Sequence, residues 1–433
     1  MRGAIAAGHP LTAEAGARVL REGGNAIDAL LAAVFTAFVT EGPLTGPAGG
    51  GFLLVHEVTG QTTVLDCFFG VPAARLGEME ELLIDFGDSG TQVFHIGPGS
   101  VAVPGLLIGL EEAHRRFATR PWRELVDPAV VLAHEGFVRD AERVTLHRIL
   151  AGILEREDGG RRIYGDPERV RTVDACGTLE RVRDAGAAMV AELIPEYADD
   201  LREYRVIEMT PLDSDVLGQT VRSTPTQGGA VVQRILALYS AKADPTPTDQ
   251  ARAVADGYGP LGSGPLPGTT HISVVDGSGT AAALSSTLGS GSGIFRGGTQ
   301  LNNMLGELDV IGVDEKASGD RLASMMTPTL VLGSAGSVRL AGAIAQVTWR
   351  ILCGMHVAAA IRAPRLHVEG TTLHLEGGWS EHDVLSLPSS WDVNRWVGLN
   401  LFFGGVQAVG WDEEGGFEAA GDPRRGGVGI VVS

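Results

Sequence analysis

The sequence is poor in cysteine, in aromatic residues and in long apolar runs. Its 433 residues include three cysteines, Cys67, Cys176 and Cys353, and 6% aromatic residues. Three widely spaced cysteines fit neither a disulfide framework nor a zinc site, so we expect buried thiols. No stretch approaches the roughly 20 uninterrupted apolar residues of a membrane span, so we expect a soluble protein. The first ten residues lack an apolar core of signal-peptide length, which favours a cytoplasmic location.

Positive charge is also scarce. The formal net charge is −19, and lysine occurs only at Lys242 and Lys316. Because phosphate binding depends on clustered lysine and arginine, this balance argues against nucleic acid as a partner. No His-Glu-x-x-His motif occurs, and the glycine-rich stretch 46–51 has no following Gly-Lys-Ser/Thr. We therefore predict no metal and no cofactor.

Glycine is abundant at 61 residues, about twice the usual share of roughly 7%, which indicates many tight turns. Between the turns, helical and strand patterns both occur, so we expect an α/β (α+β) protein. Glycines and an Asn25 cap separate the first two helices. The stretch 241–268 is rich in Pro, Gly, Asp and Thr and is predicted to be a surface linker. The expected helices cover 13–20, 26–39, 106–117, 128–136 and 231–239, and the expected strands cover 52–58, 61–65, 270–275 and 280–287.

The segment 267–276, Pro-Gly-Thr-Thr-His-Ile-Ser-Val-Val-Asp, combines a glycine, two threonines and a strand pattern. If the Gly268–Thr269 bond were cut, Thr269 would carry both a hydroxyl nucleophile and a free α-amine. The amine could then serve as the base that activates the hydroxyl. The strand is followed by a tight turn and a second strand, which would bring Thr287 near Thr269.

Small residues at 333–337, Gly-Ser-Ala-Gly-Ser, offer consecutive backbone amides of the kind that an oxyanion hole needs. From the residues alone, this stretch could equally be an ordinary turn, and the two threonine strands could be ordinary strands.

The chain resembles the γ-glutamyltranspeptidases, a family of N-terminal nucleophile hydrolases. Blocks similar to those of the family occur in family order along nearly the whole chain. They lie at 8–16, 23–29, 49–52, 100–105, 225–229, 324–329, 363–365 and 422–427.

The resemblance implies a four-layer αββα sandwich and a chain that cleaves itself before Thr269. The products would be a large subunit of residues 1–268 and a small subunit of residues 269–433, which remain one folded unit. Thr269 would be the catalytic nucleophile, with Thr287 positioning it and the amides of Gly336 and Ser337 forming the oxyanion hole. His271 belongs to the motif, and we expect it to be structural.

The sequence departs from the family at the site that binds the glutamyl group. Phe68 replaces the arginine that would bind the α-carboxylate, and a phenylalanine cannot pair with a carboxylate. Gly289 replaces an expected asparagine, Met304 replaces a polar residue, and Glu307 stands where an aspartate would bind the α-amine. Of two expected serines, Ser324 is present and its neighbour is Met325. The pocket is therefore predicted to be remodelled towards something less polar.

Two shortenings accompany these changes. Only 16 residues separate Glu307 from Ser324, too few for the lid loop of many relatives, so we expect an open pocket. The stretch between Thr329 and Gly333 is also short, so 333–337 could be a hairpin turn in place of an oxyanion hole.

The sequence thus favours a self-processing threonine amidohydrolase or acyltransferase that acts on a γ-glutamyl, glutathione-like or related acyl amide, with water or an amine as acceptor. An acylase for a non-glutamyl acyl amide, similar to cephalosporin acylases, is the first alternative. An unprocessed, non-enzymatic relative is the second.

Overall fold

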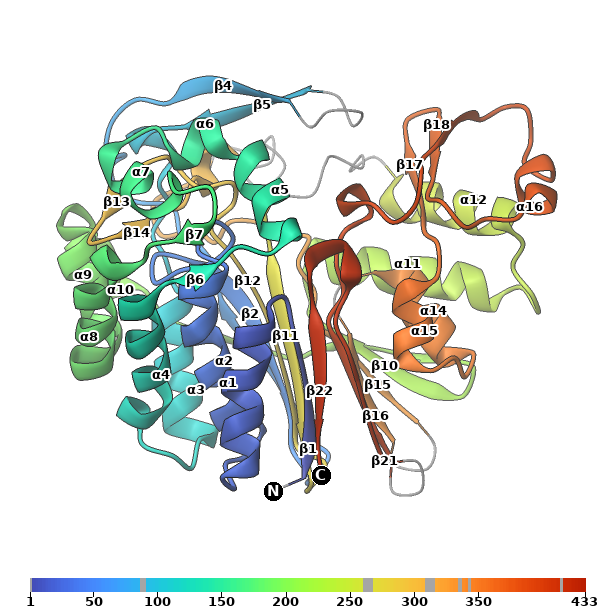
Figure 1. Ribbon diagram of the computed structural model, residues 1–433. Coiled ribbons are helices and arrows are strands. Elements are labelled where there is room, and N and C mark those ends of the chain that lie inside the picture. The colour runs from blue at the N-terminus through green and yellow to red at the C-terminus, as the bar shows by residue number, and fades with distance from the viewer. Residues whose placement is uncertain are drawn as a thin grey trace.

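The computed structural model describes residues 2–85, 91–259, 268–307, 316–333, 337–341, 344–412 and 416–433. Two β-sheets stand side by side in its centre, and helices lie on the outer side of each (Figure 1). This order of layers, helix, sheet, sheet and helix, is the αββα sandwich expected from the sequence.

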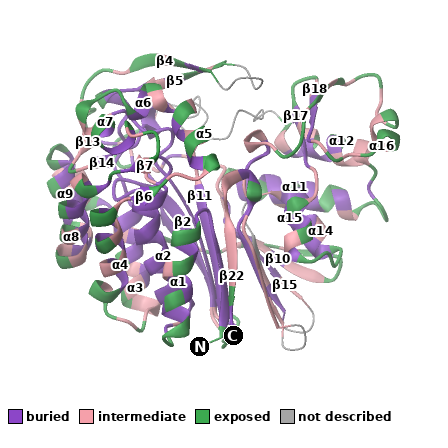
Figure 2. Cartoon of the chain, in the orientation of Figure 1, coloured by how far each residue is buried: buried purple, intermediate pink, exposed green. Residues whose placement is uncertain are grey.

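The first sheet has seven strands in the order β22-β1-β11-β12-β2-β3-β8. Thr269 directly precedes β11, whose neighbour β12 pairs with it antiparallel, so that Thr270 lies opposite Ser286. The central strands β2, β11 and β12 are buried along their whole length (Figure 2). The bounds are β1 Gly3–Ala7, β2 Gly50–His56, β3 Thr62–Cys67, β8 Ile207–Met209, β11 Thr270–Asp276, β12 Ala281–Thr287 and β22 Val428–Val432.

The second sheet has six strands in the order β21-β20-β16-β15-β10-β9. Every recorded pairing within it is antiparallel. The bounds are β9 Leu212–Val216, β10 Gln219–Ser223, β15 Thr329–Leu332, β16 Val338–Ala341, β20 Ala408–Asp412 and β21 Gly416–Ala420.

Alternation along the strands divides the apolar side chains between two interfaces. On β11, Val275 packs in one cluster with Leu330 and Val409 of the second sheet. The neighbouring Ile272 and Val274 pack instead with the helices. The start of β11 is therefore held between a helical layer and a second sheet, which fixes the position of Thr269.

Three helices cover the first sheet, α1 Pro10–Arg21, α2 Ala26–Thr40 and α3 Leu106–Phe117, and α4 Trp122–Glu135 packs against α2. Asn25 forms a capping box with Asp28 at the start of α2, as the cap prediction requires. The chain after α4 continues as a series of short helices. They are α5 Ala141–Ile149, α6 Ala151–Leu154, α7 Asp158–Tyr164, α8 Cys176–Ala185, α9 Met189–Leu193 and α10 Ala198–Glu203.

The second sheet is covered by α11 Gln227–Ser240, α12 Pro247–Tyr258, α14 Ala345–Leu352 and α15 Val357–Arg362. Helix α12 contradicts the linker predicted at 241–268 over residues 247–258, and residues 260–267 of that stretch lie outside the described part of the chain. Thr246 forms a capping box with Asp249 at the start of this helix. Pro247 occupies the first turn, where a backbone N–H would have no acceptor within the helix, so its absence costs no hydrogen bond. Buried Ala251 and Val254 then pack against α11, so the helix is part of the core.

Smaller elements complete the chain. They are the hairpin of β4 Glu80–Asp85 and β5 Thr91–Ile96, the strand pairs β6 Phe137–Val138 with β7 Arg169–Val170 and β13 Phe295–Arg296 with β14 Thr299–Gln300, the small sheet of β17 Leu366–Glu369, β18 Thr372–Leu375 and β19 Asp392–Arg395, and α16 Glu381–Leu385.

Two expectations from composition can be compared with the structure. Cys67 and Cys176 are buried free thiols, whereas Cys353 is exposed, so the expectation of burial is wrong for that residue. Within the described residues, no helix is both long enough and apolar enough to cross a membrane.

Candidate active site

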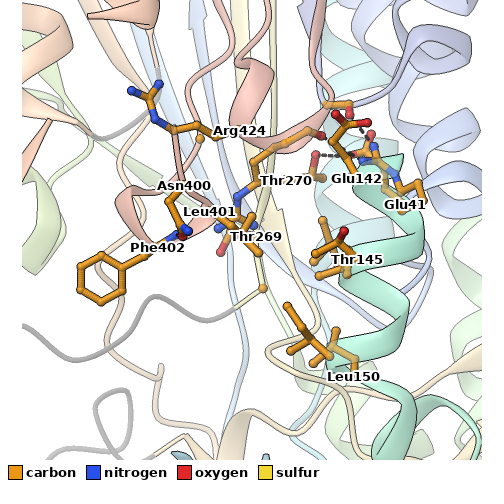
Figure 3. Close-up of a pocket in the computed structure, with 18 of the residues that line it drawn as sticks. Glu41, Glu142, Thr145, Leu150, Thr269, Thr270, Asn400, Leu401, Phe402 and Arg424 are labelled. Carbon is orange, nitrogen blue, oxygen red and sulfur yellow. Dashed lines mark hydrogen bonds between the residues drawn. The ribbon is translucent and has the colours of Figure 1, made fainter. Parts of the chain in front are cut away.

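Thr269 lines a cavity of about 920 Å³ at the end of the first sheet where β11 begins. The start of β11, the helix α5, the loop 399–402 and the C-terminal stretch 423–425 contribute to the lining. In Figure 3, Thr269 lies between Asn400 and Leu401 on one side and Thr145 on the other. The predicted nucleophile is therefore placed where a substrate could reach it.

Thr287 lies at the bond that would be cut, as its place at the end of the β11–β12 hairpin predicts. Its hydroxyl donates a hydrogen bond to the carbonyl oxygen of Gly268. The Thr287 Oγ1 in turn accepts a hydrogen bond of 2.8 Å from the backbone N–H of Gly289. Because that N–H occupies a lone pair of the oxygen, the hydroxyl proton is directed at the Gly268 carbonyl.

Gly289 adopts a backbone conformation that explains the absence of the asparagine expected there. Its φ of 68° lies in the left-handed region, which glycine adopts without strain. A Cβ atom at this position would also lie 2.2 Å from the Asn303 side-chain oxygen and 3.0 Å from Met304 Sδ. The site as built has no room for a side chain at 289.

A buried carboxyl group lies beside the nucleophile. Glu41, which directly follows α2, is 1% exposed and accepts a hydrogen bond of 2.5 Å from the hydroxyl of Thr270 (Figure 3). The hydroxyl of Thr12 contacts its other oxygen at 3.3 Å. Burial raises the pKa of Glu41, and the nearby Arg143 guanidinium opposes that rise.

His271 has the structural role predicted for it. Its ring nitrogens contact the hydroxyl of Ser285 on β12 at 2.8 Å and the hydroxyl of Ser273 on β11 itself at 2.9 Å. Burial lowers the pKa of His271 to about 3, so the ring is neutral at neutral pH. Both ring nitrogens are engaged by serine hydroxyls within the sheet, which agrees with a structural role.

Phe68 and Met304 are two of the predicted departures from the family at the site that binds the glutamyl group. They lie in an apolar cluster that also contains Phe52 and Phe69. Phe68 is 1% exposed and stacks on Phe52 with ring centroids 5.2 Å apart. Neither Phe68 nor Met304 is among the residues that line the cavity. The position at which the sequence predicted the loss of an arginine is thus packed among apolar side chains.

Glu307 and Ser324, the polar residues predicted at that site, are hydrogen-bonded to neighbouring residues. Glu307 Oε1 accepts hydrogen bonds from the Ser290 hydroxyl at 2.8 Å and from Asn303 at 3.0 Å. Ser290 lines the cavity and Glu307 does not, so Glu307 is connected to the cavity through its hydrogen bond with Ser290. Ser324 Oγ accepts from the Met326 N–H, and Met325 packs against the core beneath α11.

The structure contradicts the oxyanion role predicted for Ser337. Ser337 closes the β15–β16 hairpin, in which Leu332 pairs with Val338, so the hairpin-turn alternative holds. Val338 pairs with Trp411, and Trp411 contacts Gly279 in the turn at the far end of β11. Ser337 therefore lies at the opposite end of the sheets from Thr269.

The partner predicted for Ser337 in the oxyanion hole, Gly336, lies outside the described residues. The end of β16 nearer to the nucleophile is Ala341, because Leu340 pairs with Val409 and Gln407 accepts a hydrogen bond from Ser273 on β11. The predicted shortening of the lid loop falls largely on residues 308–315, which also lie outside the described part.

Sequence reasoning missed the charged residues around Thr269, namely Glu41, Arg143 and Arg425. They come from three distant parts of the chain, so no local spacing joins them. Arg425 lies in the block 422–427 that resembles the family, and this resemblance was the one feature of the sequence that could have indicated it. Among the described residues, no group of three or more histidines, cysteines or acidic residues is arranged to hold a metal ion.

Thr269 directly precedes a buried strand of an αββα sandwich, and the hydroxyl of Thr287 donates a hydrogen bond to the carbonyl before it. This arrangement is typical of the N-terminal nucleophile hydrolases. The family profile of gamma-glutamyltranspeptidase matches residues 12–258 and 246–432. The chain belongs to the γ-glutamyltranspeptidase family.

Individual relatives agree with this assignment. The chain is 26% identical to the glutathione hydrolase proenzyme of Bacillus subtilis (strain 168), over 100% of this chain and 92% of that protein. It is 24% identical to the acylase ACY 1 proenzyme of Pseudomonas sp. (strain SE83), over 100% of this chain and 94% of that protein. The solved structure of a cephalosporin acylase from Bacillus halodurans has the same fold, with a TM-score of 0.83, 19% identity and coverage of 100% and 96%.

Proposed function

We propose that this protein is a self-processing amidohydrolase or acyltransferase that cuts its own Gly268–Thr269 bond and then uses Thr269 as its nucleophile. The observation that carries the proposal is the hydrogen bond from the Thr287 hydroxyl to the Gly268 carbonyl oxygen. A donor at that oxygen stabilises the negative charge that develops when the carbonyl is attacked. The names of relatives as proenzymes support the same conclusion.

In this proposal, self-cleavage begins at the Thr269 hydroxyl. The Thr269 hydroxyl oxygen attacks the Gly268 carbonyl carbon, and the C–N bond breaks as the nitrogen takes up a proton. The product is an ester between Gly268 and the Thr269 oxygen. Water hydrolyses this ester, which leaves a carboxylate on Gly268 and a free α-amine on Thr269.

The same threonine then acts on a substrate. Its α-amine takes the proton of the hydroxyl, and the oxygen attacks the carbonyl carbon of an acyl amide. The amide C–N bond breaks, the leaving amine receives the proton, and the acyl group remains as an ester on Thr269. Water completes a hydrolysis, and an amine acceptor would complete a transfer.

The substrate class proposed is a γ-glutamyl or related acyl amide. The buried Phe68 and Met304 argue against the family's way of binding an α-carboxylate, because a cationic side chain at these positions would disrupt the apolar cluster. This observation favours the second candidate, an acylase for a non-glutamyl acyl amide. The acylase ACY 1 proenzyme among the relatives supports that candidate.

Incubation of the purified chain and a denaturing gel test the central proposal. We expect two bands, with mass spectrometry giving Thr269 as the N-terminal residue of the smaller one. Thr269→Ala should remain a single band, and Thr269→Ser, which keeps a hydroxyl, should still be cut. A wild-type chain that stays intact after prolonged incubation would refute processing and favour a non-enzymatic relative.

A further inference from the structure

Four arginines line the cavity that contains Thr269: Arg143, Arg148, Arg424 and Arg425. Two of them are hydrogen-bonded to the protein through their guanidinium groups. The Arg143 guanidinium donates to the carbonyl oxygens of Gly8 and Arg425, and the Arg424 guanidinium donates to Glu376, Asp422 and nearby carbonyls. These two arginines hold the fold around the site.

Arg425 differs from both. Within the described part of the chain, none of its guanidinium nitrogens has a recorded hydrogen bond and no carboxylate lies within 4.0 Å of them. Its Nε, like that of Arg143, is buried without a partner. A buried N–H that lacks a partner costs about 1–3 kcal/mol. An acceptor supplied from outside the chain is one way in which such a group is satisfied.

The backbone is shaped to let the Arg425 side chain pass. A Cβ atom on Gly405 would lie 2.6 Å from Arg425 Cγ, 3.1 Å from Cδ and 3.3 Å from Nε. Gly405 also lines the cavity. The loop that carries Asn400 and Leu401 on one side of Thr269 in Figure 3 therefore continues into a glycine that seats the arginine stem.

The charges around Arg425 leave it able to accept an anion. Asp422 is already paired with Arg365 at 2.5 Å and with Arg424, and Glu41 accepts from two threonine hydroxyls. Burial lowers the pKa of Arg425, Arg143 lowers it further, and Asp422 and Glu41 raise it. A substrate carboxylate would favour the charged guanidinium in the same way as these two acids.

We infer that Arg425 binds a carboxylate of the substrate and replaces, from the other end of the chain, the arginine that is absent at position 68. The inference rests on the proposed function, because the carboxylate must belong to an amide that reaches Thr269. Arginine suits this role, since its planar guanidinium pairs with a carboxylate through two parallel hydrogen bonds. The carboxylate belongs either to the acyl group, as in the monoamide of a dicarboxylic acid, or to the leaving amine.

Paired substrates test the inference. For the acyl group, the pair is glutaryl p-nitroanilide and pentanoyl p-nitroanilide, which have the same chain length and differ in the terminal carboxylate. For the leaving group, the pair is the pentanoyl amides of a carboxylated and an uncharged nitroaniline. In one of the two pairs, we expect Arg425→Met to lower the ratio of kcat/KM, carboxylated over neutral, by about 10- to 100-fold. KM should carry most of the change.

Two further variants sharpen the result. Methionine keeps the unbranched stem against Gly405, and Arg425→Lys should recover part of the ratio because it keeps the charge but not the bidentate geometry. Arg148→Met is the matched control, because Arg148 is an exposed arginine of the same cavity, and it should leave the ratio unchanged. Normal self-cleavage of each variant shows that it has folded.

Calorimetric titration with glutarate and with pentanoate separates this inference from the proposed function, since neither compound turns over. Tighter binding of glutarate than of pentanoate by the wild type, lost in Arg425→Met, supports the subsite. The same result without hydrolysis of any amide would refute the hydrolase and leave the subsite standing. Unchanged glutarate affinity and unchanged substrate ratios in Arg425→Met would overturn the inference.

Discussion

Thr287 is the residue whose role is defined most closely by single contacts. It donates to the Gly268 carbonyl and accepts from the Gly289 N–H at 2.8 Å. Thr287→Val keeps the shape of the side chain and removes the donor. We expect self-cleavage to slow by about 100- to 1,000-fold, the usual effect of removing one oxyanion donor, in a time course on denaturing gels.

Thr287→Ser is the matched control, because it keeps the hydroxyl and loses one methyl group. It should process within about tenfold of the wild type. Equal rates for Thr287→Val and the wild type would mean that the hydrogen bond in the precursor contributes nothing to cleavage.

Residue by residue, the sequence predicted the positions that depend on local spacing. Thr269 and Thr287 flank one hairpin, so the turn alone brings them together. Ser337 was misplaced, because small residues in a row are typical of both an oxyanion hole and a hairpin turn. Only the pairing of Val338 with Trp411 distinguishes the two.

At the scale of elements, the β11–β12 hairpin is tied to the helix α2 through Asp276. This carboxylate is 1% exposed and accepts 2.8 Å and 2.6 Å hydrogen bonds from Ser278. Its other oxygen accepts from the Ala26 N–H at the start of α2, at 2.9 Å. A negative group at a helix N-terminus is stabilising, so the turn and the helix support one another.

Asp276→Ala should therefore lower the free energy of unfolding by about 2–3 kcal/mol, since it leaves buried donors without an acceptor. Urea unfolding of the uncut Thr269→Ala chain measures this directly. Asp276→Asn keeps an acceptor oxygen and should lose less. A loss below about 0.5 kcal/mol, typical of surface positions, would show that the hairpin and α2 are not coupled through this residue.

Helix α12 shows where prediction of elements failed. Its composition is that of a linker, and its cap, Thr246 with Asp249, lies among residues that also favour turns. Burial of Ala251 and Val254 against α11 decides in favour of the helix, and that contact depends on tertiary structure.

At the scale of the whole molecule, burial of histidines links stability to pH. The pKa of His271 is lowered to about 3, chiefly by burial, from an ordinary value of 6.5. Between those two pH values the unfolded chain binds a proton at this residue and the folded chain does not. Stability therefore falls as the pH falls from 6.5 towards 3, by about 1.4 kcal/mol per pH unit for this group.

Comparison with His271→Gln isolates that contribution, because glutamine can contact both serines and does not titrate. In urea unfolding at pH 7, 6, 5 and 4, the advantage of the wild type over the variant should shrink by about 1.4 kcal/mol per unit below pH 6.5. Both proteins should carry Thr269→Ala so that one chain unfolds. Glu41 and Asp66, whose pKa values burial raises, act in the opposite direction and cancel in the comparison. A constant difference across this range would contradict the assignment.

The sequence by itself determined the alternation that divides apolar side chains between two interfaces and the hairpin that joins Thr269 to Thr287. These features depend on neighbours within a strand or across one turn, where the backbone fixes the geometry. The tertiary structure alone decided that Ser337 lies far from the nucleophile and that Glu41, Arg143 and Arg425 lie near it. Those residues are separated by most of the chain, and only the stacking of the two sheets and the return of the C-terminal strand β22 beside β1 bring them together.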